Sequence, residues 1–227
     1  MIKRACGLPR AIELALASVT LIVSLPLVLL AGVLTALTSR GPILFRQVRV
    51  GRHGQPFTFY KFRTMRRGNG TSITSEGDPR ITRVGAILRR TKIDELPSLW
   101  NVIKGDMRLV GPRPEVPRFV DTESALWREV LQEAPGITDP VTDLLRDEEK
   151  ILRSVEGDRE RFYVETLLPL KLQGYLAYQR SRSAWSDLRV LAWTALFVFR
   201  VKCPAETVTE ALSQLRTGGS LADNSQP

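Results

Sequence analysis

The longest apolar stretch of the chain lies near its N-terminus. No residue from Leu14 to Ser39 carries a charge. At about 1.5 Å per residue, a helix over these 26 residues would be about 39 Å long, which exceeds the hydrocarbon core of about 30 Å. Length alone therefore predicts a membrane helix, and the stretch is too long for a cleaved signal peptide.

Two features favour a break in this helix over a single crossing. Pro26 lies at its middle, where proline removes a backbone hydrogen bond, and the hydroxyl of Ser24 can satisfy groups freed there. Basic residues flank both ends, including Arg10 and Arg40, which favours keeping both ends on the cytoplasmic side. We expect residues 1–40 to form a re-entrant helix–break–helix that anchors the protein to the membrane. A kinked spanning helix is the alternative.

The segments that follow carry the signature of paired strands. Pro42–Val50 and Phe57–Phe62 are rich in β-branched and aromatic residues. The turn-forming sequence between them contains Gly51, Gly54 and Pro56. This pattern predicts a small β-hairpin.

Helical spacing then takes over. Ile81, Val84 and Leu88 recur at helical intervals and predict a helix over residues 81–91, after a polar loop that ends near Asp78. A second helix is expected from about Pro97, before Gly105. It would bury three apolar side chains, those of Leu99, Trp100 and Ile103.

The C-terminal third also has a helical pattern. Residues 146–161 are densely charged and predict a solvated helix in which no site is expected. Residues 163–180 have helical spacing, and residues 185–199 are mostly apolar with flanking arginines, which suits an amphipathic helix at a membrane interface as well as an ordinary core helix. The fold class we expect is α+β and predominantly helical, with a catalytic domain over 41–203 and a polar, disordered tail over 204–227.

The charge of the chain is concentrated in its middle. The 227 residues carry a net charge of +9, and residues 46–118 hold 16 Lys and Arg against 6 Asp and Glu. Such a block indicates an anionic partner, although a solvated basic face is the ordinary alternative. One histidine and two distant cysteines exclude a histidine-paired zinc site and a zinc finger, and no P-loop or dinucleotide-binding glycine motif occurs.

Adjacent carboxylates stand inside this basic block. Asp94 and Glu95 precede Pro97, so they lie at or before a helix start, where Asp94 could simply cap the helix. Within twenty residues lie eight cations: Arg80, Arg83, Arg89, Arg90, Lys92, Lys104, Arg108 and Arg113. A carboxylate can attack phosphorus only when cations screen the negative charge of the substrate. A nucleophilic aspartate among guanidinium groups, next to a membrane, is what transfer of a phosphorylated sugar onto a lipid phosphate would need.

Several ordered motifs resemble those of one family, the bacterial sugar transferases, and within it the small monotopic phosphoglycosyl transferases. The resemblance covers roughly Arg10 to Lys202. It rests on Gly41–Gln47, Phe59–Met65, Asp94–Pro97, Asn101–Met107 and Val110–Glu115.

The resemblance implies a ping-pong reaction at the cytoplasmic face of the bacterial inner membrane. Asp94 matches the family nucleophile, which attacks the β-phosphate of a UDP-sugar and releases UMP. Undecaprenyl phosphate then takes the phosphosugar from the aspartyl intermediate. Glu95 matches the second member of the pair, and Mg²⁺, held by Asp94 and Glu95, is the implied cofactor. Six residues match positions assigned to substrate or phosphate contacts: Lys61, Arg63, Arg89, Pro112, Arg113 and Pro114. Ser24 and Pro26 match the break in the membrane helix.

The chain departs from the family pattern in two informative places. Leu25 separates Ser24 from Pro26, where the family commonly has adjacent serine and proline. The sequence Pro135–Asp143 replaces a longer common motif, so nucleotide contacts carried there do not transfer to this chain. Asp187 matches an aspartate of the family's C-terminal helix without an assigned role. A non-catalytic basic membrane scaffold and a nucleic-acid-binding protein are the alternatives; the long uncharged segment and the lack of a recognition fold disfavour nucleic acid.

Overall fold

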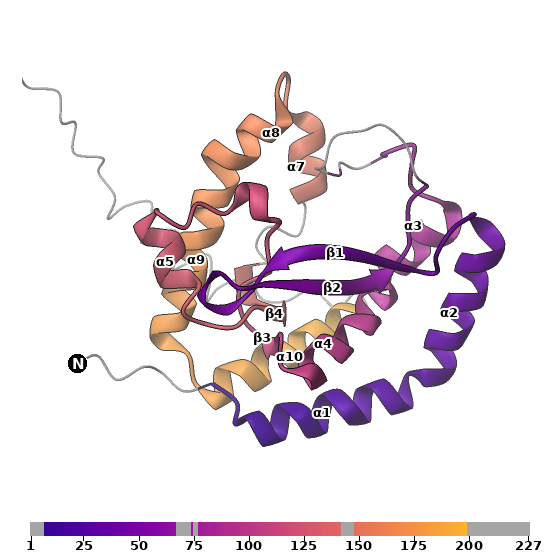
Figure 1. Cartoon of the computed structure of the whole chain (residues 1–227), viewed down its shortest axis with the longest axis horizontal. Coiled ribbons are helices and arrows are strands. Elements are labelled where there is room, and N and C mark those ends of the chain that lie inside the picture. Colours follow the sequence, from indigo (N-terminus) through magenta and orange to yellow (C-terminus); the bar gives the residue numbers. More distant parts are fainter. Residues whose placement is uncertain (1–6, 67–73, 75–76, 142–147, 199–227) are drawn as a thin grey trace, which may run out of the picture.

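The computed structural model describes residues 7–66, 74, 77–141 and 148–198 (Figure 1). The C-terminal tail, both cysteines and most of the polar loop before Asp78 lie outside the described residues. Within them the fold is α+β and predominantly helical, as predicted, with two small two-stranded sheets.

The apolar N-terminal segment forms two helices with a sharp break between them. Helix α1 covers Arg10–Val23, helix α2 covers Leu25–Thr38, and their axes bend by 58° at Ser24. The hydroxyl of Ser24 donates to the carbonyl of Leu21, 3.2 Å away. Pro26 lies in the first turn of α2, where its missing N–H leaves no helical bond unmade. The predicted break is therefore confirmed, in spite of the intervening Leu25.

The shape of the break differs from a tight hairpin. A single linking residue is too short to reverse the chain, so the helices form an open elbow along one side of the domain (Figure 1). Among the described residues, neither helix alone has the length and apolarity needed to cross a bilayer, whereas the bent pair taken together does.

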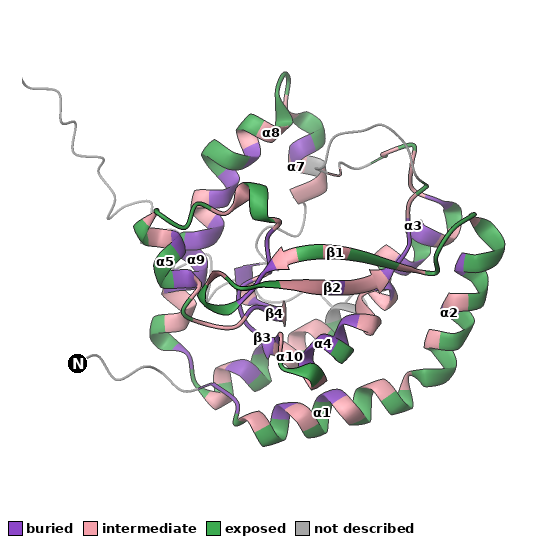
Figure 2. Ribbon diagram, in the orientation of Figure 1, coloured by how far each residue is buried: buried purple, intermediate pink, exposed green. Residues whose placement is uncertain are grey.

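The outer face of the elbow is apolar and uncovered. Figure 2 shows exposed residues along both helices. The side chains of Ile22, Val23 and Leu37 are 70%, 74% and 79% exposed. The inner face packs on the domain through small side chains, those of Ala17 and Ala31, which are buried. An exposed apolar face of this extent is typical of a surface that contacts lipid or another protein.

Both ends of the elbow are tied to the same domain. At the start of α1, the buried carboxylate of Glu13 accepts from Arg108, with Oε2 2.9 Å from Nε. At the end of α2, Arg63 donates to the backbone carbonyl of Ser39 at 2.6 Å and to that of Pro42. The apolar helices thus leave and rejoin one globular unit.

The predicted hairpin is present beside the elbow. Strands β1 (Leu44–Val50) and β2 (Pro56–Phe62) pair antiparallel around a short turn, η1 (Arg52–Gly54). Strands β3 (Arg108–Val110) and β4 (Gly136–Thr138) form a parallel pair.

The first predicted helix of the middle segment is shorter than expected. Helix α3 runs over Arg83–Arg90, and its N-cap is Thr82, whose hydroxyl accepts from the N–H of Gly85 at 2.8 Å. Ile81 lies before the helix, in a β-bridge with Met65. The turn η2 (Ile93–Ser98) follows, and then helix α4 (Leu99–Lys104).

The expectation that α4 buries Trp100 is wrong. Leu99 is buried, but Trp100 is 53% exposed and shares an apolar groove with Leu29 and Val33 of α2. Because α2 presents its apolar face outward, Trp100 has apolar neighbours beside it without being buried in the core.

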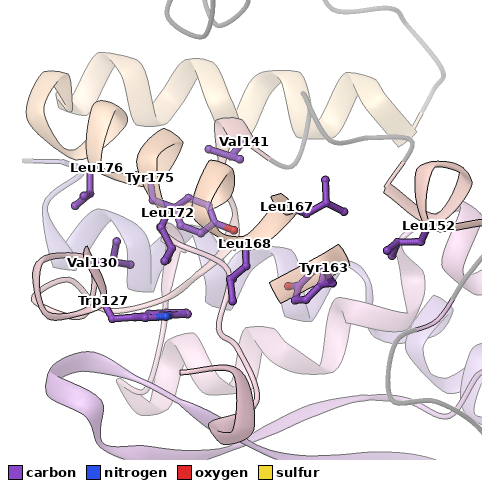
Figure 3. Packing of buried hydrophobic residues seen from close by; sticks show 10 residues of the cluster. All are labelled: Trp127, Val130, Val141, Leu152, Tyr163, Leu167, Leu168, Leu172, Tyr175 and Leu176. Atoms are coloured by element: carbon purple, nitrogen blue, oxygen red, sulfur yellow. The ribbon is translucent and has the colours of Figure 1, made fainter. Parts of the chain in front are cut away.

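The C-terminal helices surround the largest hydrophobic cluster. A short turn, η3 (Pro117–Phe119), precedes these helices. In chain order they are α5 (Ala125–Val130), α7 (Glu148–Ser154), α8 (Arg159–Phe162), the π-helical turn η4 (Tyr163–Leu167), α9 (Leu168–Ser181) and α10 (Ala184–Val198). Figure 3 shows this cluster, in which Trp127 and Leu172 pack among aliphatic side chains. The single solvated helix predicted over 146–161 is two shorter helices in the described part of that segment.

Helix α10 has one exposed face and one buried face, and its sequence is compatible with both. Trp185 is 69% exposed, whereas Asp187 is completely buried. The carboxylate of Asp187 accepts from the N–H of Leu8 at 2.8 Å, from Tyr178 Oη at 2.7 Å and from Arg182. Asp187 therefore fastens the segment that leads into α1 onto the C-terminal helices.

Candidate active site

The acidic pair lies in the turn η2, between helices α3 and α4. Lys92, the residue before this turn, has φ of 58°, in the left-handed region, which redirects the chain after α3. The hydroxyl of Ser98 donates to the carbonyl of Glu95 at 2.6 Å and closes the turn. The local sequence therefore presents Asp94 and Glu95 on a short, internally bonded turn.

Glu95 is held by an arginine from the loop after β3. Arg113 Nη2 lies 2.5 Å from Glu95 Oε1, and Nη1 lies 3.5 Å from Oε2. Burial favours the neutral acid, but the charges of Arg113 and Lys92 outweigh it and lower the pKa of Glu95 to about 2. The Glu95 carboxylate is consequently ionised and fixed in place.

Asp94 has the opposite environment. Its side chain is buried, and its Oδ1 atom has no hydrogen-bond partner among the described residues. Burial, and then the neighbouring charge of Glu95, raise the pKa of Asp94 to about 6. Neither η2 nor α4 has a side-chain cap, so the reading of Asp94 as a helix cap is not supported. A buried carboxylate oxygen without a partner is expensive and is typical of a functional group.

Cations stand around this pair in a large cleft of about 2430 Å³. Lys61 and Arg89, both expected at the site, line the cleft together with the acidic pair and Arg113. Burial lowers the pKa of Lys61 to about 8, against the attraction of Glu95 and Asp94. Arg89 donates to Glu149 of α7. Apolar residues of α1 and α10, including Leu16 and Leu191, line other parts of the same cleft.

Three of the expected contact residues have structural bonds of their own. Arg63 lines the cleft, and it uses Nε, Nη1 and Nη2 to bond Ser39 and Pro42, so its guanidinium also joins the end of α2 to the hairpin. The carbonyl of Pro112 accepts from the N–H of Gly136 at 2.9 Å, and that of Pro114 accepts from Arg49 at 2.9 Å. These two prolines frame Arg113.

Sequence reasoning missed several residues of the cleft wall. Glu115, Tyr163 and Lys171 meet in a buried network, and Glu148 and Glu149 of α7 reach the cleft. The charged run that contains Glu148 and Glu149 has the composition of a solvated surface. Their partners, Lys171 and Arg89, lie tens of positions away in the sequence. The one local signal was that Glu115 directly follows the Pro112–Pro114 segment.

The donor set is compatible with the expected Mg²⁺. Among the described residues no group of three or more His, Cys, Asp or Glu gathers as a metal cage. Mg²⁺, however, is commonly held by one or two carboxylates together with waters and substrate phosphates. The unpartnered oxygen of Asp94, next to the Glu95 carboxylate, offers that smaller set.

Comparison with known proteins places these features in one family. The model of the bacterial sugar transferases matches residues 4–201. The chain is 38% identical over 191 residues to a UDP-glucose:undecaprenyl-phosphate glucose-1-phosphate transferase of Caulobacter vibrioides, which covers 82% of this chain and 67% of that protein. It is 32% identical over 203 residues to an enzyme of the same name from Escherichia coli K12, with 82% and 39% covered.

A third relative differs in its named sugar. The chain is 50% identical over 99 residues to a UDP-N-acetylgalactosamine-undecaprenyl-phosphate N-acetylgalactosaminephosphotransferase of Aeromonas hydrophila, covering 42% of this chain and 23% of that protein. The chain thus spans less than half of the length of the Escherichia and Aeromonas proteins. The family match runs through the apolar elbow, the acidic turn and the C-terminal helices alike. This protein belongs to the bacterial sugar transferase family and is a transferase.

Proposed function

We propose that this protein transfers a sugar phosphate from a UDP-sugar to undecaprenyl phosphate through a covalent intermediate on Asp94. The observation that carries the proposal is the unpartnered, buried oxygen of Asp94 beside a Glu95 carboxylate that Arg113 holds fixed. The printed activities of the relatives, which join UDP-sugars and undecaprenyl phosphate, support the substrate class.

The chemistry assigned to Asp94 is nucleophilic attack. Its carboxylate oxygen forms a bond to the β-phosphorus of the donor, while the bond from that phosphorus to the bridging oxygen breaks and UMP departs with the electron pair. In the second step an oxygen of the lipid phosphate attacks the same phosphorus and releases the Asp94 carboxylate. A pKa of about 6 leaves Asp94 mostly ionised at neutral pH yet retains more basicity than an ordinary aspartate has.

The surrounding cations make this attack feasible. A carboxylate and a phosphate repel each other unless positive charge lies close to both. Lys61 and Arg89 line the cleft beside the pair, and they would contact the substrate phosphates, Arg89 through N–H groups other than the Nη2 that donates to Glu149. Arg113 keeps Glu95 ionised and oriented.

Mg²⁺ belongs to the proposal as a cofactor. Asp94 and Glu95 would hold it, and when bound it neutralises negative charge on the substrate phosphates. The protein's own part is to hold two carboxylates of unlike basicity side by side, one fixed by Arg113 and one free.

The proposed location is the cytoplasmic face of the bacterial inner membrane, with the elbow as a re-entrant anchor. Each half of the elbow has 14 residues, about 21 Å of helix, which falls short of the core of about 30 Å. Both ends are bonded to the same domain, at Glu13 and at Ser39. Entry and exit at one face agree with both facts, and in this arrangement the cleft would lie near the lipid substrate.

A transfer assay tests the proposed function. Purified full-length protein is incubated with Mg²⁺, undecaprenyl phosphate and a panel of UDP-glucose, UDP-galactose and UDP-N-acetylgalactosamine, and UMP release is measured. Asp94→Asn should abolish release, whereas Asp121→Asn, an exposed aspartate outside the cleft, should not change it. Full turnover by Asp94→Asn would overturn the role of that residue, and no release with any donor would favour a non-catalytic protein.

A further inference from the structure

A second group of side chains, four charged and one a tyrosine, forms part of the cleft wall, beyond the loop that holds Arg113. Its members are Glu115, Glu148, Glu149, Tyr163 and Lys171, and all five line the cleft. We call them the polar wall. It begins two residues after Arg113, and Arg49 links the two regions because it donates to Pro114 and lies 3.8 Å from Glu115 Oε2.

The inner part of the polar wall is buried and internally bonded. Tyr163 Oη donates to Glu115, and Lys171 Nζ donates to Tyr163 Oη at 3.0 Å and lies 3.5 Å from Glu115 Oε1. The π-helical turn η4 makes this meeting possible. Residues eight apart in a plain α-helix point about 80° away from each other, and the extra residue of a π turn reduces that difference.

The outer part of the polar wall consists of two carboxylates whose positions are fixed by cations. Lys171 Nζ lies 3.3 Å from Glu148 Oε2, and Arg89 donates to Glu149. The side chains of Glu148 and Glu149 are nevertheless 28% and 46% exposed, so each keeps acceptor capacity that faces solvent. Side chains held by a bonded support are the usual construction of a binding site.

A buried hydroxyl nearby has an unmet hydrogen bond. Tyr175 is 3% exposed and its Oη has no partner among the described residues. Burial, and then the charges of Asp139 and Glu115, raise the pKa of Tyr175 well above its ordinary value, so the hydroxyl keeps its proton. In Figure 3 the oxygens of Tyr163 and Tyr175 point toward the space between their rings. Tyr175 is not among the residues that line the cleft, so its hydroxyl belongs to the buried cluster beside the polar wall and not to the cleft surface.

The chemistry of the polar wall suits hydroxyl groups better than phosphates. Free carboxylate oxygens repel phosphate but accept hydrogen bonds from sugar hydroxyls, as an acidic residue does for ribose in dinucleotide-binding folds. Arg89, the partner of Glu149, is one of the cations available to the donor phosphates. A donor with its phosphates near Arg89 and Arg113 would place its hydroxyl-bearing rings along α7.

We infer that Glu148 and Glu149 form a donor subsite that accepts hydrogen bonds from ring hydroxyls of the UDP-sugar, with Lys171 and Arg89 as the positioning residues that hold the two carboxylates. The inference rests on the proposed function and deepens it. The hydroxyls come either from the transferred sugar or from the ribose, and the two sources have the same chemistry.

Charge-neutral variants test the subsite. Glu148→Gln and Glu149→Gln keep size and remove the charged acceptor, and Glu156→Gln is the matched control, an exposed glutamate a few residues further along that does not line the cleft. The readouts are KM and kcat for UMP release with the UDP-sugar that the wild type turns over, and the inhibition constant of UMP. We expect the KM of each cleft variant to rise about tenfold with a smaller change in kcat, the cost of one charged hydrogen bond.

The outcomes distinguish the two sources of the hydroxyls, and they show which of the two proposals fails. An unchanged inhibition constant for UMP assigns the hydroxyls to the transferred sugar, and a constant that rises with KM assigns them to ribose. A KM equal to that of Glu156→Gln overturns the subsite, and a lower KM would show instead that the glutamates compete with phosphate for Arg89. Calorimetric titration of the UDP-sugar onto the same proteins keeps the two proposals distinct. If no transfer occurs, the proposed function is overturned. If the cleft variants bind the UDP-sugar with the same affinity as Glu156→Gln, the subsite is overturned.

Discussion

Arg113 holds Glu95 with Nη2 2.5 Å from Oε1, while the adjacent carboxylate, Asp94, keeps an oxygen that no described residue contacts. Two neighbouring acids therefore have pKa values on opposite sides of their ordinary range, about 2 for Glu95 and about 6 for Asp94. Groups that the environment separates in this way have separate roles in many active sites. This separation agrees with the proposed mechanism, in which Glu95 supplies a fixed charge and Asp94 the reacting oxygen.

Replacement of Arg113 should uncouple the pair. Arg113→Lys keeps the charge but loses the planar fork that reaches both oxygens of Glu95, so we expect kcat/KM to fall about tenfold to a hundredfold. Steady-state UMP release measures the effect. Arg118→Lys, at a half-exposed arginine paired with Glu160, is the control and should stay near wild type. Equal activity of the two variants would mean that Arg113 does not orient Glu95.

Lys61 should set an alkaline limit on activity. Burial lowers its pKa to about 8, so the ammonium loses its proton, and its attraction for phosphate, as the pH rises through that value. kcat/KM, which reports the ionisations of the free enzyme, should therefore decline above about pH 8. Lys61→Arg should extend the plateau to higher pH because guanidinium stays charged. Lys104→Arg, at an exposed lysine, should leave the wild-type profile unchanged. An identical alkaline limb in Lys61→Arg would contradict the assignment.

Asp187 should matter for stability more than an exposed acid does. Asp187→Ala removes the closest charged partner of the buried Arg182, which keeps only Glu133 at 3.6 Å and the carbonyl of Val110, and it removes the acceptor of the Leu8 N–H. We therefore expect a loss of about 3 kcal/mol in the free energy of unfolding. Glu129→Ala breaks only an exposed pair with Arg180 and should cost less than about 1 kcal/mol. Denaturant unfolding in detergent measures both. Similar losses in the two variants would show that the buried pair is not a fastening point.

The ends of the elbow should lie on one side of the membrane. Single cysteines are placed before α1 with Pro9→Cys, after α2 with Arg40→Cys and on α4 with Lys104→Cys, in a background where Cys6 and Cys203 are serine. A maleimide that cannot cross membranes should label all three in inside-out vesicles and none in right-side-out vesicles. Labelling of Pro9→Cys and Arg40→Cys from opposite sides would establish a spanning helix.

Local sequence was enough for the acidic turn but not for its surroundings. Asp94 and Glu95 could be found because their chemistry and the nearby proline lie within a few residues. The break at Ser24 could be found because proline acts on its own helix. The polar wall could not be found in this way, since Glu148 of α7 meets Lys171 of α9 only in the folded chain, and the charged run around Glu148 has the composition of a solvated surface.

Two other residues show that residue type alone does not determine the contacts or the burial of a side chain. Arg63 has the charge of a phosphate ligand, but its donors satisfy the carbonyls of Ser39 and Pro42. Trp100 has the hydrophobicity of a core residue, but it lies beside the outward apolar face of α2. For both residues, contacts with another part of the chain determine the position of the side chain, and residue type alone does not reveal those contacts.

Peptide mass spectrometry of the loaded enzyme tests the central claim most directly. The wild-type protein is incubated with Mg²⁺ and a UDP-sugar that it turns over, without undecaprenyl phosphate, and then quenched and digested. We predict a mass gain of one sugar phosphate on the peptide that carries Asp94, absent in Asp94→Asn and discharged when undecaprenyl phosphate is added. Continued UMP release and lipid product with no adduct on that peptide would contradict the account.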